Sequence, residues 1–343
     1  MDYELGDAIR IRIGDGILED VRGLFEQMRA SVPAPDLSVV SGKVGGQGLR
    51  VSDTLFVSRG SYRLLHAGTA YEVSLGSIVC DGKADDDFVR YELLPPVMNR
   101  ILVPKGWCLL HASAVSLRGR NVLMPAMGGT GKTSLLIDFM MRGADFIGDD
   151  RVLVSNDGDF VSYPQKLHLL DYNFRVFPEL FDLSFRDAEE RRRMKRRYSR
   201  YTTGLGMRED SVASRLIKTR LTSRYYFEHS APPKDLFPES STVVSGRISD
   251  VFLLTREEGI GVQDARPDEL GPLAAVSTWL DDSAWLHCIA SHLSGLPHHS
   301  LEDEERALSL AFSHAKCHQV GMGASYDRKS IEAIGEQIRR SLS

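Results

Sequence analysis

The stretch Pro125-Ala126-Met127-Gly128-Gly129-Thr130-Gly131-Lys132-Thr133 decides how this chain is interpreted. It fits the phosphate-loop pattern G-x-x-x-x-G-K-[ST], except that Ala126 stands in place of the first glycine. Its glycines let the backbone turn N–H groups around an anion without steric cost, and the helix that follows adds its own unpaired N–H groups. We therefore expect a nucleotide site made of Gly128, Gly129, Thr130, Gly131, Lys132, Thr133 and Ser134. Lys132 would reach the β- and γ-phosphates, and the hydroxyl of Thr133 would bind Mg²⁺.

The residues around this loop predict alternating strands and a helix. Apolar, strand-like runs cover residues 107–115 and 121–126, and an amphipathic helix after the loop ends near Gly143. Residues 145–155 form a further strand-like run. A strand, a helix and a strand within about thirty residues are typical of α/β sheets covered by helices.

An acidic pair, Asp149-Asp150, follows Gly148 inside the last of these runs. Neighbouring side chains on a strand point to opposite sides, so one carboxylate can face Mg²⁺ while the other faces an acceptor. A carboxylate near the γ-phosphate can accept the proton of an attacking hydroxyl, as kinase chemistry requires. The pair therefore predicts a phosphotransfer site beside the loop.

Together, His111, the loop residues 128–133 and Gly148-Asp149-Asp150 resemble the catalytic domain of bacterial HPr kinase/phosphorylase and its relatives. The wider fold group of that family includes the phosphoenolpyruvate carboxykinases. In the family a histidine lies 21 residues before the loop lysine and an Asp-Asp pair lies 17 and 18 residues after it. His111, Lys132, Asp149 and Asp150 have the same spacing. The resemblance covers roughly residues 102–155.

The resemblance implies an α/β fold with an HPr-kinase-like P-loop core and a serine-kinase type of activity. The reaction would be ATP-dependent transfer of the γ-phosphoryl group to a hydroxyl on a protein, a peptide or a small molecule. It also implies roles for individual residues: Lys132 binds phosphate, Thr133 and Asp149 hold Mg²⁺, Asp150 accepts the proton, and His111 assists beside the acidic pair.

The chain lacks two features of the family, and it has Thr133 where the family usually has serine. The family's Glu-x-Arg-Gly signature is not visible, and similar spacing would put it near Phe174, where nothing matches. The later catalytic arginine has no clear counterpart, although Arg215, Arg220 and Arg224 lie in that neighbourhood. The alternative to a kinase is a non-catalytic, nucleotide-binding regulatory or scaffold protein.

Residues 1–96 are predicted to form a mixed, mostly β module, separate from a catalytic domain over residues 97–343. Short strand-like runs recur from residue 9 to residue 80, with one helix expected over residues 17–28. Pro95-Pro96 marks the expected break, because proline disrupts a strand ladder and constrains the residue before it.

A basic insert is expected at about residues 185–235. Between residues 186 and 224 there are 13 Lys and Arg against five Asp and Glu, a local charge of +8 in a chain whose net charge is −5. The richest part, Arg191 to Arg200, admits three roles: a clamp for an acidic acceptor, a nucleic-acid surface or a solvated insert. Nucleic acid is the least favoured, because the domain as a whole is not basic.

The composition excludes several classes of protein. With 42% hydrophobic and 26% charged residues over 343 positions, the chain is globular rather than fibrous or disordered. It has no apolar run of membrane-spanning length, and its first residues do not form a secretory signal. The four cysteines lie far apart, without a Cys-x-x-Cys pair. We therefore expect a cytoplasmic protein without a membrane partner, and the resemblance also allows a homo-oligomer.

Overall fold

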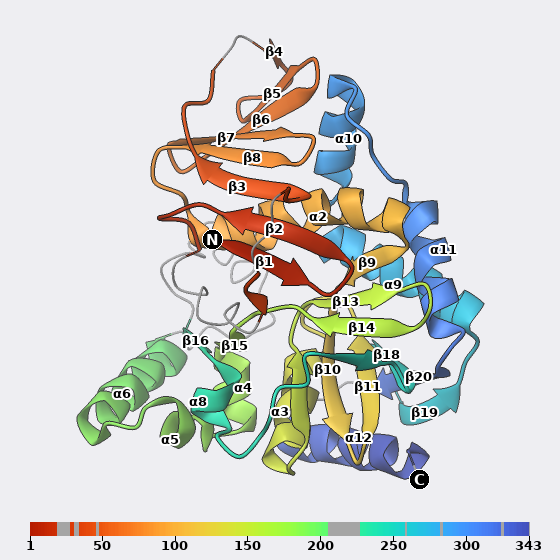
Figure 1. The fold of residues 1–343 in the computed structure, drawn as a ribbon. Helices are drawn as coiled ribbons and strands as arrows, with labels where there is room; N and C mark the ends of the chain where they lie inside the picture. The colour runs from red at the N-terminus through yellow and green to blue at the C-terminus, as the bar shows by residue number, and fades with distance from the viewer. Residues whose placement is uncertain are drawn as a thin grey trace.

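The computed structural model describes residues 1–18, 28–30, 34–45, 48–204, 227–257, 259–281, 284–323 and 326–342. It is a mixed α/β structure, so the predicted fold class is confirmed at that level. A sheet built from the N-terminal residues lies at one end of the molecule (Figure 1), and the sheet that carries the phosphate loop lies at the other. No helix among the described residues is long and apolar enough to cross a membrane.

The N-terminal sheet has the strand order β1-β2-β3-β8-β7-β6-β5-β4. Its side chains alternate as one buried face requires: Ile9, Ile11 and Ile13 point into the core, while Arg10 and Arg12 lie on the other side of β2. Most of the strand-like runs predicted before residue 81 are confirmed, whereas the helix expected over residues 17–28 falls mainly outside the described residues. The strands are β1 (Asp2–Leu5), β2 (Ile9–Ile13), β3 (Leu37–Ser41), β4 (Leu49–Arg50), β5 (Leu55–Ser58), β6 (Ser61–His66), β7 (Thr69–Ser74) and β8 (Ser77–Asp81).

Helical segments connect this sheet to the rest of the chain. They are the π-helix η2 (Phe88–Leu93), α2 (Leu94–Leu102) and the 3-10 turn η3 (Val103–Lys105). Pro95 and Pro96 occupy the first turn of α2, where a missing N–H leaves no hydrogen bond unmade. The prolines therefore begin a buried helix, and the division of the chain into two domains near residue 96 stays a prediction.

The core sheet has the strand order β12-β10-β11-β18-β20-β19 and carries the phosphate loop. β11, β18 and β20 run parallel, so their carboxyl ends lie at the same edge. α3 (Lys132–Met141) and α12 (Arg328–Ser341) cover one face; α9 (Pro267–Asp281) and α11 (Leu301–Phe312) cover the other. The strands are β10 (Ala112–Leu117), β11 (Arg120–Pro125), β12 (Asp145–Gly148), β18 (Asp250–Thr255), β19 (Ile260–Asp264) and β20 (Lys316–Met322).

A smaller sheet, β17-β14-β13-β9, lies between the other two (Figure 1). It contains β9 (Trp107–Leu110), β13 (Val152–Ser155), β14 (Asp159–Ser162) and β17 (Ser245–Arg247). Two predictions were wrong here. The strands expected over residues 107–115 and 145–155 are each broken in two, because their first and second halves pair with partners in different sheets. The breaks fall at His111 and at Asp149-Asp150-Arg151.

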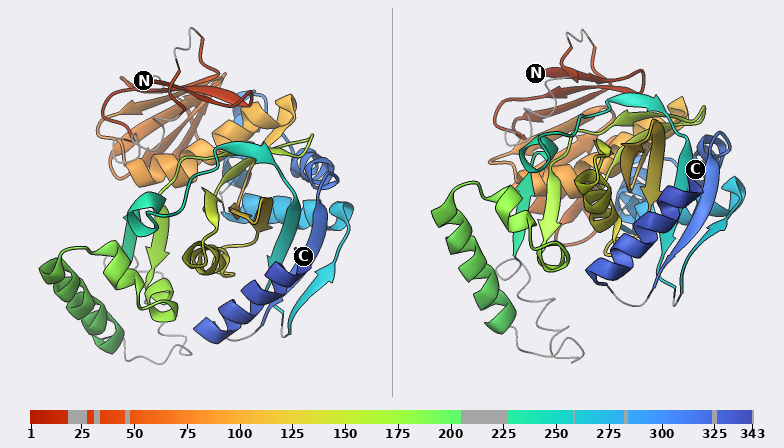
Figure 2. Two further views of the ribbon diagram at one scale, coloured as in Figure 1. Left: turned by 60° about the horizontal axis from the view of Figure 1, so that its bottom comes forward. Right: turned by 90° about the horizontal axis from the view of Figure 1, so that it is seen from below.

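The basic insert is more regular than its charge suggested. The described residues of the insert expected at about residues 185–235 include the long helix α6 (Ala188–Gly204), β16 (Glu228–Ala231) and most of α8 (Pro233–Leu236), and α5 (Leu180–Ser184) precedes them. α6 stands out from the body of the molecule (Figure 2). The neighbouring elements are β15 (Leu167–Leu170), which pairs with β16, and α4 (Asp171–Val176). α10 (Ala284–Ser294) packs against β5 and β6 of the N-terminal sheet.

Candidate active site

The phosphate loop connects the end of β11 to the start of α3. Gly131 caps α3 with φ +119°, a backbone conformation that side chains strongly disfavour. A Cβ at this position would lie 2.9 Å from Cε of Met322 and 3.2 Å from Cε2 of Tyr326. Gly129 also has a positive φ, +71°. Glycine is therefore required at position 131 and favoured at position 129.

Lys132 lies inside the loop that precedes it. Its side chain is buried, and Nζ donates to the carbonyl oxygens of Ala126 (2.8 Å) and Met127 (3.3 Å). Thr130 is buried in the same loop. The hydroxyl of Ser134 is fully buried and accepts a hydrogen bond from Asn173 Nδ2 at 2.9 Å, so this side chain points into the protein. The backbone N–H groups in the first turn of α3 can therefore bind an anion in the loop.

Asp149 lies directly over the first turn of α3. Its Oδ1 accepts hydrogen bonds from Ser113 (2.6 Å) and from the hydroxyl of Thr133 (3.1 Å), and its side chain is only 2% exposed. Burial raises the pKa of Asp149 to about 6, and the negative charge of Asp150 adds to this effect. Ser113, Lys132 and Thr133 act in the opposite direction. Asp149 is thus a buried carboxylate held against the phosphate loop.

Asp150 points to the other side and is more open. Its side chain is 37% exposed, and Oδ1 lies 2.7 Å from Nε2 of His111. Arg151 donates to the Asp150 carbonyl at 2.7 Å, and the same Nη1 lies 3.5 Å from Oδ2. Burial alone would raise the pKa of Asp150, but the charge of Arg151 and the contact with His111 hold it well below its ordinary value. Asp150 is therefore ionised and reachable from solvent.

The backbone of Asp150 is strained, with φ +71°. Few residues other than glycine adopt this conformation, and it costs about 1 kcal/mol or more. The strain is local to the point where the chain leaves β12 and enters β13 in the smaller sheet. It turns two adjacent carboxylates toward different partners, Asp149 toward Thr133 and Asp150 toward His111.

His111 lies where the chain passes from the smaller sheet to the core sheet, the opposite direction to the crossing at Asp150. It follows β9 of the smaller sheet and precedes β10 of the core sheet, and its backbone N–H donates to Oγ1 of Thr278 at 3.1 Å. The structure therefore brings together His111, Lys132, Thr133 and both aspartates, which the sequence analysis selected. Their catalytic roles remain predictions.

The donor set near Thr133 fits a magnesium ion. Magnesium prefers oxygen ligands and usually keeps only one or two from the protein. Oγ1 of Thr133 lies 3.1 and 3.3 Å from the two carboxylate oxygens of Asp149, so the two side chains can share one cation. Among the described residues there is no cluster of three His, Cys, Asp or Glu that could hold a metal by itself. Further ligands would have to come from phosphate and water.

An arginine that the sequence analysis did not select lies against the phosphate loop. Arg256 follows β18 and donates through Nη2 to the carbonyl of Gly129. Within the described part of the chain Arg256 makes no ion pair. The signal was available, because residues just after the carboxyl ends of parallel strands commonly bind ligands in α/β sheets. The arginines considered from sequence, Arg215, Arg220 and Arg224, lie outside the described residues.

Two tyrosines near the acidic pair were also missed. Burial raises the pKa of Tyr172 on α4, and the charges of Asp149 and Asp150 contribute to the same shift. Burial likewise raises the pKa of Tyr91 on η2, again with a contribution from Asp150. No local motif marks either tyrosine, because each is brought to the site only by tertiary packing. Phe174, where the Glu-x-Arg-Gly signature was sought, is a core residue.

No protein-family model matches this chain. No curated protein matches its sequence either. Among solved structures, the Hpr(Ser) kinase/phosphatase from Coxiella burnetii is similar over 68% of this chain and 90% of that chain, with a TM-score of 0.32 and 8% identity. A likeness of this size says nothing about chemistry, which has to come from the side chains described above.

Proposed function

We propose that this protein is an ATP-dependent kinase that transfers the γ-phosphoryl group to a hydroxyl, with Mg²⁺ held beside the phosphate loop. In this proposal residues 97–343 contain an HPr-kinase-like P-loop core and residues 1–96 form a separate module. The observation that carries the proposal is the divergence of two adjacent carboxylates. Asp149 is buried against Thr133, whereas Asp150 is partly exposed and held by His111.

The difference in solvent exposure between Asp149 and Asp150 supports different roles for the two carboxylates. Asp149 has little access to solvent, so it suits a metal ligand but cannot meet an incoming acceptor. Asp150 can be reached from outside, so it suits the group that orients the acceptor hydroxyl and takes its proton. The hydrogen bond from Nε2 of His111 fixes the direction of that carboxylate.

The proposed reaction is a single displacement. The acceptor oxygen forms a bond to the γ-phosphorus, the bond from that phosphorus to the bridging oxygen breaks, and nucleoside diphosphate leaves. The hydroxyl proton passes to Asp150. Phosphate groups bound nearby raise the pKa of Asp150 from its low value in the ligand-free protein, which makes it a better proton acceptor.

Positive charge for the transferring group would come from Lys132, from Arg256 and from the metal. Magnesium, when held by Thr133 and Asp149, supplies neutralisation of phosphate charge. Lys132 now donates to carbonyl oxygens of its own loop, and Arg256 donates to Gly129. Both cations can exchange these backbone acceptors for phosphate oxygens, which form stronger, charge-assisted hydrogen bonds.

We place the acidic part of the acceptor on α6. Arg191 and Lys195 share the carboxylate of Asp182, and Arg193 pairs with Glu190. Arg192, Arg196 and Arg197 make no ion pair with the described residues, so this helix carries positive charge that an acidic group could meet. The hydroxyl of Tyr198, on the same helix, donates to the carbonyl of Asp171 at 3.2 Å, directly before Tyr172. An acidic peptide or protein bound to α6 would therefore lie next to the residues that surround Asp150.

The proposal is tested by replacing Asp150 with asparagine. Full-length protein is incubated with γ-³²P-ATP, Mg²⁺ and a cell extract, and labelled products are resolved by gel and by thin-layer chromatography. In parallel, N-methylanthraniloyl-ATP (mant-ATP) measures nucleotide binding by fluorescence. We expect D150N to lose transfer about 100-fold or more, because a positioned base contributes that much. Its affinity for mant-ATP should stay within about threefold, because the phosphate-binding groups remain.

Two further variants make the result specific. Asp157→Asn changes an exposed aspartate in the turn after β13 and should affect neither measurement. Lys132→Ala removes a phosphate-binding group and should weaken both. If D150N transfers phosphate as fast as the original protein, Asp150 is not the base. If the original protein binds mant-ATP with Mg²⁺ but labels no acceptor, the non-catalytic regulatory alternative is favoured instead.

A further inference from the structure

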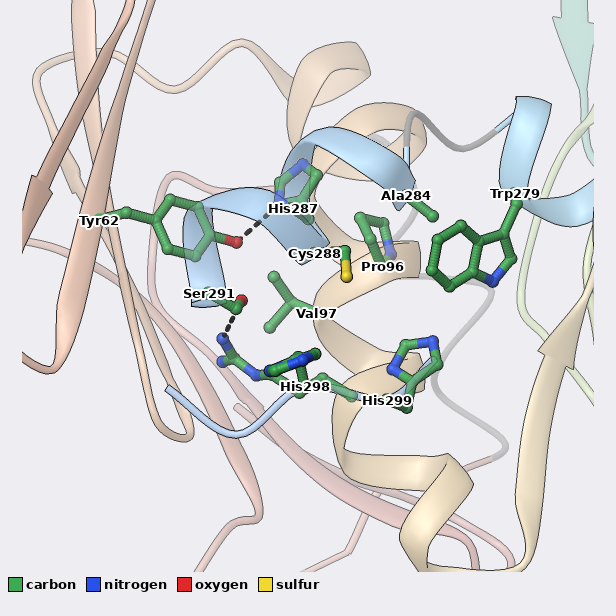
Figure 3. Close-up of a pocket in the computed structure, with 11 residues that line it drawn as sticks. Tyr62, Pro96, Val97, Trp279, Ala284, His287, Cys288, Ser291, His298 and His299 are labelled. Carbon is green, nitrogen blue, oxygen red and sulfur yellow. Dashed lines mark hydrogen bonds between the residues drawn. The ribbon is translucent and has the colours of Figure 1, made fainter. Parts of the chain in front are cut away.

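A second pocket lies away from the phosphate loop, where the N-terminal sheet meets α2 and α10. Tyr62 from β6 and Trp279 from α9 stand on opposite sides of it, with Val97 and Cys288 between them (Figure 3). The cavity measures about 20 Å³, and the exposed His298 is one of the residues that line it. It is slightly larger than one water molecule needs. The proposed kinase chemistry makes no use of this pocket.

The pocket contains a buried cation, Arg100, that has no counterion among the residues that the structure describes. Arg100 on α2 is 6% exposed, and its guanidinium donates to the carbonyl of Ser74 (2.6 Å) and, weakly, to the hydroxyl of Ser291 (3.5 Å). Among the described residues Arg100 makes no ion pair, and its Nε has no partner. Burial raises the pKa of the neighbouring Tyr62, so this phenol stays neutral and cannot balance the charge. A buried arginine in this state is stabilised by an anion.

Other groups that line the pocket are also donors or neutral. Nε1 of Trp279 is a buried N–H without an acceptor in the described structure. Burial lowers the pKa of His287 to about 4, so it is neutral near pH 7, and its Nδ1 lies 2.6 Å from the hydroxyl of Tyr62. The imidazole of His299 is directed by Nε2 toward Glu304 at 2.5 Å, so that carboxylate serves His299 rather than Arg100.

We propose that this pocket binds the carboxylate group of a small organic acid. The site offers Arg100 and the indole N–H of Trp279 as donors, and no carboxylate lines it within the described residues. The carboxylate oxygens would accept hydrogen bonds from these donors and displace water from the small cavity, while Val97, Pro96 and the ring of Trp279 would pack against the carbon chain of the acid. Because the pocket joins β6 to α2 and α10, the bound acid would tie the N-terminal sheet to the helices beneath it.

The test uses butyrate as the probe and the full-length protein. Binding is followed by tryptophan fluorescence, by ligand-observed NMR and by thermal stability at constant ionic strength. We expect saturable binding of butyrate, with weaker binding of acetate. Butanol has the same carbon chain without the carboxylate and should not bind. Sodium chloride at the same ionic strength should not reproduce the effect.

Two variants examine the donors. Trp279→Phe keeps the ring but removes the N–H, and should weaken butyrate binding about tenfold or more, as for a hydrogen bond to a charged group. Arg100→Met keeps an apolar stem and should abolish binding. If that variant does not fold, W279F carries the test, because it leaves Arg100 in place. Trp107→Phe, on β9 away from the pocket, is the matched control and should bind butyrate normally.

Several results would overturn the inference: no saturable binding up to about 100 mM butyrate, equal binding of butanol, an equal effect of chloride, or unchanged affinity in W279F. The mant-ATP assay is run on the same variants. Normal nucleotide binding in W279F together with lost butyrate binding would show that the two sites are separate. The proposal for this pocket can therefore fail or stand independently of the proposed kinase activity.

Discussion

Replacing Asp149 with asparagine should make the ligand-free protein more stable, although it removes the proposed metal ligand. The carboxyl has a pKa of about 6 in the folded protein, against 3.8 for an ordinary aspartate. A pKa raised by folding means that the folded state resists ionisation. The contribution of Asp149 to the free energy of unfolding is therefore greatest below about pH 3.8, where the carboxyl is protonated. This contribution is lost as the pH rises through 6.

The size of the effect follows from that difference. About two pH units at 1.36 kcal/mol each correspond to about 3 kcal/mol of destabilisation at pH 8. Asparagine carries no charge but accepts fewer hydrogen bonds than the carboxylate, which receives them from Ser113 and Thr133. We therefore expect a net gain of about 1 to 3 kcal/mol, or a rise in Tm of about 2 to 4 °C for a chain of this length.

The assay is thermal unfolding in EDTA at pH 8 and at pH 5, without nucleotide. The gain should be about half as large at pH 5, where much of the carboxyl in the folded protein is already protonated. With saturating Mg²⁺ and ATP the order should reverse, because only the original protein gains binding energy from the metal. Asp250→Asn is the control. Asp250 is fully buried in an ion pair with Arg120 at 2.7 Å, so its replacement should lower Tm.

Two results would refute this reasoning. One is a D149N variant that is less stable than the original protein at pH 8 in EDTA. The other is a gain in stability that does not depend on pH. Either result would mean that ionisation of the buried Asp149 carboxyl does not destabilise the ligand-free protein.

Two further predictions concern the same loop. Ser113→Ala removes the hydroxyl that lowers the pKa of Asp149, so the pH midpoint of Mg²⁺-dependent mant-ATP binding should rise from about 6 by about one pH unit; an unchanged midpoint would contradict this. Gly131→Ala forces a Cβ to within 2.9 Å of Met322 at φ +119° and should lower mant-ATP affinity about tenfold or more, together with Tm. Its control, Gly143→Ala, has φ +84° but meets no atom within 4 Å, so it should lower Tm without changing nucleotide affinity. Equal loss of binding in both glycine variants would show that the contact with Met322 is irrelevant.

The sequence was sufficient to find the residues that meet at the site. A glycine-rich loop, an acidic pair and a histidine can each be recognised from a few neighbouring residues. Only short elements connect them in the chain, so they also lie close together in the fold. The structure brings Asp149 to Thr133 and Asp150 to His111. Side chains that reach the site through long-range packing had no such signal. Tyr91 and Tyr172 belong to this group.

The arrangement of strands could not be predicted in the same way. A fully buried strand is apolar along its whole length, so its pattern does not reveal where the chain passes from one sheet to another. The runs over residues 107–115 and 145–155 therefore looked continuous. The helix α6 was likewise not predicted, because its many charged residues leave no apolar stripe of the kind that marks an amphipathic helix in the sequence.

The two breaks in these strands lie side by side, at the place where the chain passes twice between the smaller sheet and the core sheet. One crossing between the smaller sheet and the core sheet passes through His111, and the other passes through Asp150; the side chains of the two residues are 2.7 Å apart. Any twist of one sheet against the other must strain that contact. A movement of Asp150 toward a ligand would therefore also shift the smaller sheet relative to the core sheet at this point.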